Sequence, residues 1–222
     1  QALVWSGVVA ALSIGSMVVG NFLALAQKNI KRLLAYSSIA QAGYMLIGVA
    51  AAGAGGESLP YTATTYYLLA YLATNLAAFG VVAAVSRLTG SEQIADYRGL
   101  NQRAPGLSLA LAVAVLSLGG IPPFAGFFGK VVVFASGIQA GLTWLVIIGI
   151  LNAVVGLYYY LTVLRVVYQR AEEVEGETPL AIPAAWKTAA VLSAAGIVAI
   201  GVLFLPWYNL SMQAASSLLT FR

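Results

Sequence analysis

The sequence predicts an all-α, polytopic membrane protein with six transmembrane helices, one of which is discontinuous at Gly119–Pro123. Of the 222 residues, 61% are hydrophobic and 8% are charged, with a mean hydropathy of +0.90, whereas soluble domains carry about 25% charged residues. The apolar residues also form long, charge-free runs of the length that crosses a bilayer. A soluble fold must present its exterior to water, so the bilayer is the solvent that fits this composition.

The charged residues mark the ends of the expected spans. A helix rises about 1.5 Å per residue and needs about 20 apolar residues to cross the hydrocarbon core. The spans expected from the charge-free runs cover about residues 3–26, 33–55, 61–86, 107–138, 141–165 and 188–208. All except 107–138 have the length of a single crossing. Residues 1–222 are therefore expected to form one transmembrane domain.

The loops between the spans predict how the chain is oriented. Three alternate loops hold the basic residues Lys28, Lys31, Arg32, Arg87, Arg98, Arg103, Arg165, Arg170 and Lys187, the last loop together with the acidic run Glu172, Glu173, Glu175 and Glu177. The opposite side has only Glu57 and Arg222. Loops rich in Lys and Arg stay in the cytoplasm. We therefore expect a multi-pass protein of the cell inner (plasma) membrane with both ends outside.

Residues 107–138 are too long for one straight crossing and too short for two. As a single helix they would measure about 48 Å, against a hydrocarbon core of about 30 Å. Gly119, Gly120, Pro122 and Pro123 lie in the middle, and proline removes a helical N–H and pushes the residue before it out of the α region. We expect two half-helices joined by unwound backbone near mid-membrane, where transporters build ion sites. A proline kink that only serves packing is the alternative.

Lys130 is the one ionisable side chain expected deep inside a span, because the sequence stays apolar from Val131 to Trp144. It follows Pro123 by about two helical turns. An isolated charge in the membrane costs about 2.5–3.5 kcal/mol on insertion scales. Burial favours the neutral amine, so a lysine placed there can bind and release a proton near neutral pH. We interpret Lys130 as a proton carrier; a side chain that only reaches the lipid headgroups is the alternative.

Uncharged polar residues also occur inside the spans. Tyr67, Tyr71 and Asn75 share one face of the third span at i, i+4 and i+8, and Tyr71 and Asn75 are predicted to support a polar path to Lys130. The other polar residues are interpreted as contacts that join helices or as an interfacial belt: Tyr36, Ser37, Ser38, Gln41, Tyr44, Tyr66, Thr74, Tyr158, Tyr159 and Tyr160.

The chain contains neither Cys nor His. Thiolate and imidazole metal ligands, iron–sulfur clusters, His-ligated haem and Cys or His catalysis are thereby excluded. We expect no cofactor, metal or redox centre in this chain. Its basic residues lie between apolar runs rather than in one patch, so the expected partner is the lipid bilayer and not nucleic acid.

Two stretches resemble the proton-translocating transmembrane family of respiratory complex I, which Mrp-type sodium/proton antiporters and membrane-bound hydrogenases share. They are Asn29–Gly48 (NIKRLLAYSSIAQAGYMLIG) and Leu116–Lys130 (LSLGGIPPFAGFFGK). The run Gly156–Leu161 (GLYYYL) is most similar to subunit N of bacterial complex I and is also similar to subunit 2 of the mitochondrial and photosynthetic enzymes. The resemblance covers essentially the whole chain.

The resemblance implies a subunit of fourteen helices with two inverted five-helix repeats, each containing one broken helix. The six spans would be its last six, so that the N-terminal repeat, with the glutamate and lysine of its channel, lies upstream of Gln1. Lys130 matches the lysine that the family uses as its exit-side proton carrier. Asn75 stands where subunits L and M carry a lysine, which favours the subunit N type.

The implied function is a proton-translocating subunit of NADH-quinone oxidoreductase (complex I) that couples quinone reduction to proton pumping. NADH and quinone would bind to partner subunits, and other membrane-arm subunits would be direct partners. The alternatives are a subunit of a cation/proton antiporter or membrane-bound hydrogenase of the same family, a stand-alone secondary transporter, and a structural membrane subunit whose Lys130 pairs with a neighbour.

Overall fold

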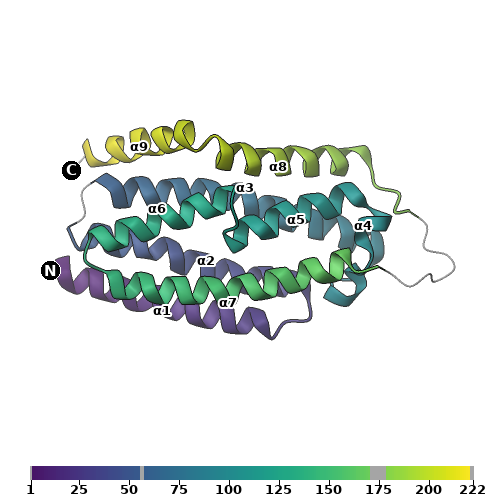
Figure 1. Cartoon of the computed structure of the whole chain (residues 1–222), viewed down its shortest axis with the longest axis horizontal. Coiled ribbons are helices and arrows are strands. Elements are labelled where there is room, and N and C mark those ends of the chain that lie inside the picture. Colours follow the sequence, from purple (N-terminus) through teal and green to yellow (C-terminus); the bar gives the residue numbers. More distant parts are fainter. Residues whose placement is uncertain (1, 56–57, 171–178, 221–222) are drawn as a thin grey trace.

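The computed structural model describes residues 2–55, 58–170 and 179–220, and the regular elements in these ranges are helices (Figure 1). Their bounds are α1 Ala2–Leu25, α2 Ile30–Gly53, α3 Ser58–Thr89, α4 Leu100–Arg103, α5 Pro105–Gly119, α6 Ala125–Gln139, α7 Thr143–Tyr168, α8 Ala184–Val202 and α9 Phe204–Thr220, with a 3-10 helix at Ile94–Tyr97. The predicted all-α class is confirmed for this part of the chain. Glu57, Arg222 and the acidic run at 172–177 lie outside the described residues.

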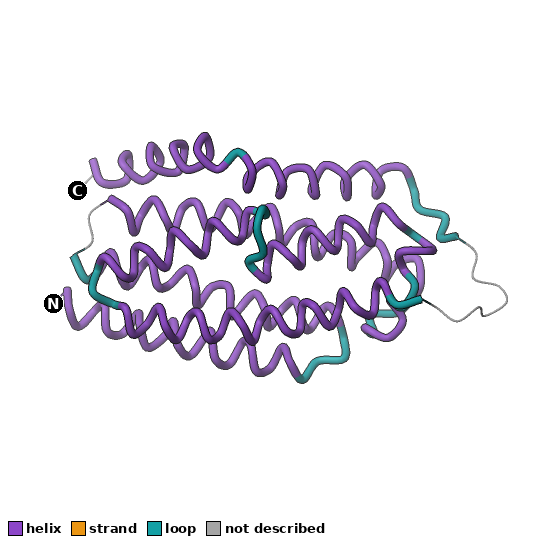
Figure 2. The backbone as a smooth tube through the Cα atoms, in the orientation of Figure 1, coloured by secondary structure: helices purple, strands orange, loops and turns teal. Residues whose placement is uncertain are grey.

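Five of the described helices are long and apolar enough to cross a membrane: α1, counted from Val4, and α2, α3, α7 and α8. The helices α5 and α6 have 15 residues each, too few to cross alone, and they occupy the expected span 107–138. They follow one another along the bundle, with a short irregular segment between them (Figure 2). The six-span prediction counts this pair as one crossing and stays a prediction.

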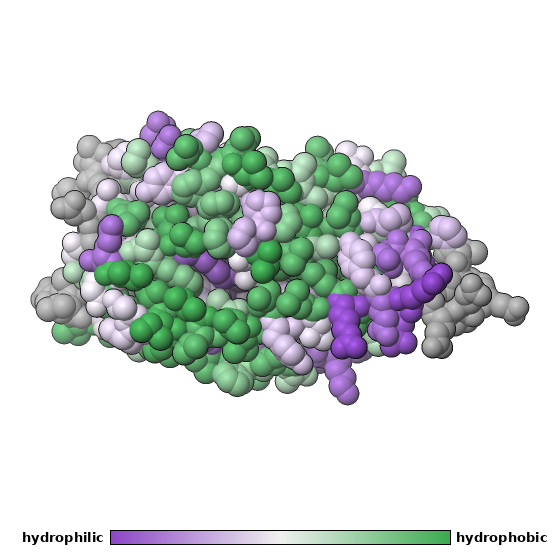
Figure 3. All heavy atoms as spheres, in the orientation of Figure 1, coloured by the Kyte–Doolittle hydropathy of each residue, from purple (hydrophilic) through white to green (hydrophobic). Residues whose placement is uncertain are grey.

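The two ends of the bundle differ in chemistry. Both chain termini lie at one end, whereas the turn from α1 to α2, the connection from α3 to α5 and the C-terminal end of α7 lie at the other (Figure 1). Hydrophilic side chains gather at that second end, and the side of the bundle in view is mostly apolar (Figure 3). Large apolar side chains such as Leu76, Leu151 and Val154 are more than half exposed along these sides, as lipid-facing residues are.

Small residues let α1 and α2 approach closely. A Cβ added at Gly20 would lie 2.6 Å from the backbone N of Ala40, and one at Gly43 would lie 2.8 Å from the backbone N of Met17. Ser13 on α1 donates a 2.7 Å hydrogen bond to the Gly43 carbonyl. Close backbone contact through small residues is the usual way in which membrane helices associate. The contact fixes α2, whose inner face carries the polar groups described below.

At the hydrophilic end, the loop after α3 contacts the start of α2. Asn29 caps α2 by accepting from the Arg32 N–H at 2.9 Å, and its amide donates to Glu92 at 3.1 Å. Lys31 also pairs with Glu92 at 3.1 Å. The hydrogen bond from Asn29 and the neighbouring Lys31 ammonium lower the pKa of the Glu92 carboxyl. Exposed ion pairs stabilise a fold little, so this contact mainly fixes how the loop lies against α2.

The expected span 188–208 is interrupted in the structure. The helix α8 ends at Val202, and α9 begins at Phe204 and continues to Thr220. In a continuous helix the Val202 carbonyl would accept from residue 206, but Pro206 has no N–H. Pro206, which lies within the expected span 188–208, therefore accounts for the interruption.

The two interruptions in the bundle touch one another. A Cβ at Gly201, near the end of α8, would lie 2.1 Å from the Pro123 carbonyl oxygen and 2.8 Å from the Ala125 backbone N. Tyr66 on α3 donates to the Ile200 carbonyl at 3.1 Å. The end of α8 is thus held against the turn between α5 and α6 by backbone contact, and only glycine fits at this point.

Candidate functional site: a lysine at a broken helix

The turn between α5 and α6 frees backbone carbonyls, among them the Leu118 carbonyl. In a continuous helix the Leu118 carbonyl would accept from the N–H of residue 122, and Pro122 has none. Gly120, at a φ of 80°, ends α5, and its N–H turns back to the Ser117 carbonyl at 3.0 Å. A left-handed φ suits glycine because it has no Cβ. The Leu118 carbonyl is left without a backbone donor and is available to side chains from other helices.

The Ser117 hydroxyl links the end of α5 to the start of α6 and to α3. It accepts from the Gly126 N–H at 3.0 Å, which supplies a partner to the first turn of α6. The same hydroxyl shares a 3.0 Å hydrogen bond with Thr74 on α3. A Cβ at Gly126 would lie 2.0 Å from the Ser117 carbonyl oxygen. The start of α6 therefore rests directly on the end of α5, and α3 holds both.

Lys130 extends from α6 back to this break. Its side chain is only 6% exposed, and its Nζ donates a hydrogen bond to the Leu118 carbonyl. The Nζ also lies 5.2 Å from the centre of the Tyr44 ring. A Cβ at Gly120 would lie 3.1 Å from the Lys130 Cδ, so the glycine leaves room for the aliphatic stem. Within the described residues no carboxylate pairs with this amine.

Gln41 on α2 shares the same acceptor. Its Nε2 donates to the Leu118 carbonyl at 3.0 Å and lies 3.3 Å from the Tyr160 hydroxyl. Its Oε1 accepts from the Tyr67 hydroxyl, and Tyr160 is hydrogen-bonded in turn to Ser37. Gln41, Tyr67 and Tyr160 are all buried. We call these three residues, with Ser37 and the Leu118 carbonyl, the amide cluster.

A second polar cluster lies around the Tyr44 hydroxyl. Asn21 on α1 donates to the Tyr44 hydroxyl at 3.1 Å and to the Asn152 side-chain oxygen at 3.3 Å. The Tyr159 hydroxyl donates to Asn21 at 3.0 Å. The Tyr159 and Tyr160 rings lie 4.5 Å apart, centre to centre, so the two clusters are adjacent. All of their side chains are uncharged, and among the described residues Lys130 is the one ionisable amine beside them.

The predicted site residues are only partly brought together. Lys130 lies at the break formed by Gly119, Gly120, Pro122 and Pro123. Tyr71 is half-buried and packs against buried apolar residues of the core. Neither Tyr71 nor Asn75 is hydrogen-bonded to the described residues. On α3 it is Tyr67, one turn before Tyr71, that reaches the site.

Sequence reasoning interpreted Gln41 and Tyr44 only as residues that join helices. In the structure the Tyr44 ring lies beside the Lys130 amine, and Gln41 donates to the same Leu118 carbonyl as Lys130 does. The signal that could have found them is their spacing. Ser37, Gln41 and Tyr44 lie at i, i+4 and i+7 on α2 and so share one face. Three polar side chains on the buried face of a membrane helix indicate a polar interior.

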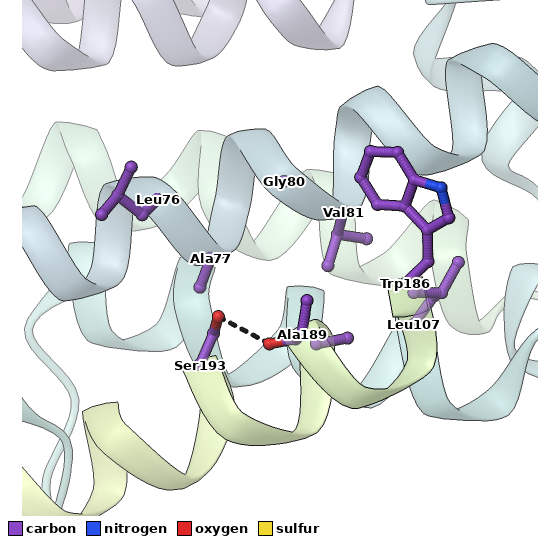
Figure 4. Close-up of a pocket in the computed structure, with 9 residues that line it drawn as sticks. Leu76, Ala77, Gly80, Val81, Leu107, Trp186, Ala189 and Ser193 are labelled. Carbon is purple, nitrogen blue, oxygen red and sulfur yellow. Dashed lines mark hydrogen bonds between the residues drawn. The ribbon is translucent and has the colours of Figure 1, made fainter. Parts of the chain in front are cut away.

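A cavity of about 260 Å³ between α6 and α7 reaches Lys130 from the side of the bundle. Its walls are apolar, and the exposed residues Val131, Ile150 and Val154 stand at its rim. A smaller cavity of about 80 Å³ lies between α3, α5 and α8 (Figure 4). There Ser193 bonds to the Ala189 carbonyl of its own helix, so that cavity offers no group that carries protons. The described residues contain no cluster of acidic side chains that could hold a metal ion.

Comparison with known proteins gives the same family from sequence. Residues 1–156 match the family described as NADH:quinone oxidoreductase/Mrp antiporter, TM. Subunit 2 of the NAD(P)H-quinone oxidoreductase of Nostoc punctiforme is 51% identical over 161 residues, which cover 72% of this chain and 29% of that protein. The same subunit of a Picosynechococcus species is 43% identical over an alignment that covers 96% of this chain and 41% of that protein.

Solved structures have the same fold. A chain of respiratory complex I from Thermus thermophilus with bound aureothin is 39% identical, with a TM-score of 0.75 over 89% of this chain and 43% of that one. A chain of the Mrp complex from Dietzia sp. is 20% identical, with a TM-score of 0.85 over 96% of this chain and 47% of that one. This chain is a multi-pass membrane protein that belongs to the NADH:quinone oxidoreductase/Mrp antiporter transmembrane family.

Proposed function

We propose that the chain is the C-terminal half of a subunit N type (subunit 2) component of a proton-translocating NADH-quinone oxidoreductase, and that Lys130 carries protons in it. The observation that supports this most is the position of the Lys130 amine, which is buried beside unwound backbone and held by a carbonyl and a tyrosine ring, with no acid beside it among the described residues. The higher identity to quinone oxidoreductase subunits than to the Mrp chain favours this assignment over a cation/proton antiporter.

The surroundings of Lys130 suit an amine that alternates between two protonation states. A buried ammonium without a counter-ion is unfavourable, and a buried neutral amine is tolerated. The Leu118 carbonyl and the Tyr44 ring favour the ammonium in part, so neither state is strongly preferred. The hydroxyl groups of the two clusters both donate and accept, whereas the Leu118 carbonyl that holds the amine only accepts. In this proposal the amine turns away from the carbonyl to exchange its proton with these hydroxyl groups, and Tyr71 and Asn75 extend the path along α3.

The rest of the assembly supplies the energy. In this proposal NADH and quinone bind to partner subunits, this chain holds no cofactor, and charge shifts that accompany quinone reduction drive Lys130 between its states. The chain makes six crossings of the inner membrane, with α5 and α6 counted as one and α8 and α9 as another. Its hydrophilic end faces the cytoplasm, both of its ends lie outside, and its partners are other membrane-arm subunits and lipid.

Replacing Lys130 by methionine in the whole complex is expected to lower the number of protons pumped per electron pair, because methionine has similar volume and no proton to exchange. Pumping is measured by pH change in sealed vesicles, and quinone reduction is measured in the same vesicles with an uncoupler. Lys130→Arg should also lower the number of protons pumped per electron pair, because arginine stays charged and does not release its proton. Unchanged pumping with normal quinone reduction in both variants would refute a proton-carrying Lys130.

A further inference from the structure

The Leu118 carbonyl accepts from two buried side chains on different helices. Lys130 reaches it from α6 and Gln41 reaches it from α2. We infer that Gln41 is a positioning residue: it holds this carbonyl in place for the Lys130 amine and keeps it hydrogen-bonded whenever the amine turns away. The inference rests on the proton-carrying role proposed for Lys130, and it assigns to Gln41 a task that is separate from carrying protons.

The contacts fix the orientation of the Gln41 amide. A backbone carbonyl only accepts, so the NH₂ end of the amide must face Leu118. The oxygen then faces Tyr67, whose hydroxyl must be the donor. The amide is held at both ends, by α3 through Tyr67 and by α5 through Leu118. Gln41 is only 2% exposed, so bulk water does not compete for these two contacts, and the orientation is kept while Lys130 moves.

The Gln41 amide, as a second donor, determines how easily Lys130 can leave the Leu118 carbonyl. If Lys130 were the sole donor, its departure would leave the Leu118 carbonyl buried and unpaired, which is unfavourable. The amine would then be held at the carbonyl as an ammonium and would release its proton reluctantly. With Gln41 in place the carbonyl stays paired in both positions of Lys130. Gln41 therefore makes the two states of the lysine more nearly equal in free energy.

In the described part of the chain, the titratable groups around the contact between Lys130 and the Leu118 carbonyl are all phenols. They are Tyr44 on α2, Tyr67 and Tyr71 on α3, and Tyr159 and Tyr160 on α7. The α1 and α5 groups at the site are the amide of Asn21, the hydroxyl of Ser117 and backbone. None of the described acidic residues lies at the site to compensate for the loss of Gln41, so the effect of that loss should be seen directly in the pH dependence of pumping.

The test replaces Gln41 by methionine in the whole complex and measures protons pumped per electron pair across a range of pH. Met matches the side-chain length and cannot donate. Because the ammonium becomes harder to deprotonate, the pH profile of pumping should move to higher pH by about one unit, with quinone reduction in uncoupled membranes retained. A Gln41→Met enzyme with the wild-type profile would overturn the inference.

Two further variants make the result specific. Ser13→Ala also removes a buried hydrogen bond to α2, at the Gly43 carbonyl, but does not touch Leu118, so it should keep the wild-type profile; an equal shift there would overturn the inference.

Gln41→Glu keeps the shape and adds a carboxylate beside the amine. It should abolish pumping at neutral pH even if the methionine variant fails to assemble, and a wild-type profile for it would overturn the inference. If Lys130→Met leaves pumping intact, the proposed function itself has failed.

Discussion

Replacing Pro122 by alanine is expected to reduce proton pumping to the level of Lys130→Met while the complex still assembles. The new N–H at residue 122 can bond to the Leu118 carbonyl, as in an ordinary helix. Lys130 and Gln41 then lose the acceptor on which they converge. The unwound stretch shortens and the amine is left facing apolar walls, where it stays neutral. Protons pumped per electron pair in sealed vesicles, and the amount of assembled complex on native gels, measure the two parts of this expectation.

Pro105→Ala is the matched control, because Pro105 is the first residue of α5, where no helical N–H is required. It should pump as the wild type does. Normal pumping by Pro122→Ala would mean that the free carbonyl at Leu118 is not needed for proton transfer.

Replacing Gly126 by alanine is expected to destabilise the subunit and lower the yield of assembled complex. The added Cβ would lie 2.0 Å from the Ser117 carbonyl oxygen and 2.8 Å from the Ser117 carbonyl carbon. Both are backbone atoms, so α5 and α6 would have to separate. Overpacking of this kind costs about 1–3 kcal/mol or more, and here it would also break the Ser117–Gly126 hydrogen bond. Thermal unfolding of the purified complex and its yield on native gels measure the loss.

Gly106→Ala lies on the same broken span, and a Cβ there would meet no atom within 4 Å. It should leave stability and yield unchanged. If Gly126→Ala were as stable as this control, the close contact of the two half-helices would be absent from the assembled protein.

The sequence alone was sufficient to predict the break between α5 and α6, because the twin prolines act locally on the backbone. The expected span 188–208 also contains a proline, Pro206, near its end, but no break was predicted there. The structure interrupts the helix just before it. Proline's effect on a helix is local, whereas deciding where a span ends depends on the neighbouring helices.

The partners of Lys130 could not be predicted in the same way. The Gln41 amide meets a carbonyl 77 positions further along the chain, and the Asn21 amide meets Asn152, 131 positions away. Helical periodicity says which residues share a face, but not which helix that face meets. For this reason Asn75, although on the expected face of α3, has no hydrogen bond to the described residues, and Gln41 was interpreted as a helix-joining contact.

The most direct measurement restores the amine chemically. This chain has no cysteine, so Lys130→Cys introduces one thiol into it, and the cavity between α6 and α7 leaves room for a label at that position. Aminoethyl methanethiosulfonate attaches an amine that can lose its proton, whereas the trimethylammonium analogue attaches a charge that cannot. Mass spectrometry of the subunit first establishes that each label is attached.

If Lys130 gains and loses a proton, the untreated Lys130→Cys complex should pump poorly, the aminoethyl label should restore protons pumped per electron pair, and the trimethylammonium label should not. Equal restoration by both labels would mean that a fixed positive charge suffices. Full pumping by the unlabelled variant would mean that no amine is needed at this position.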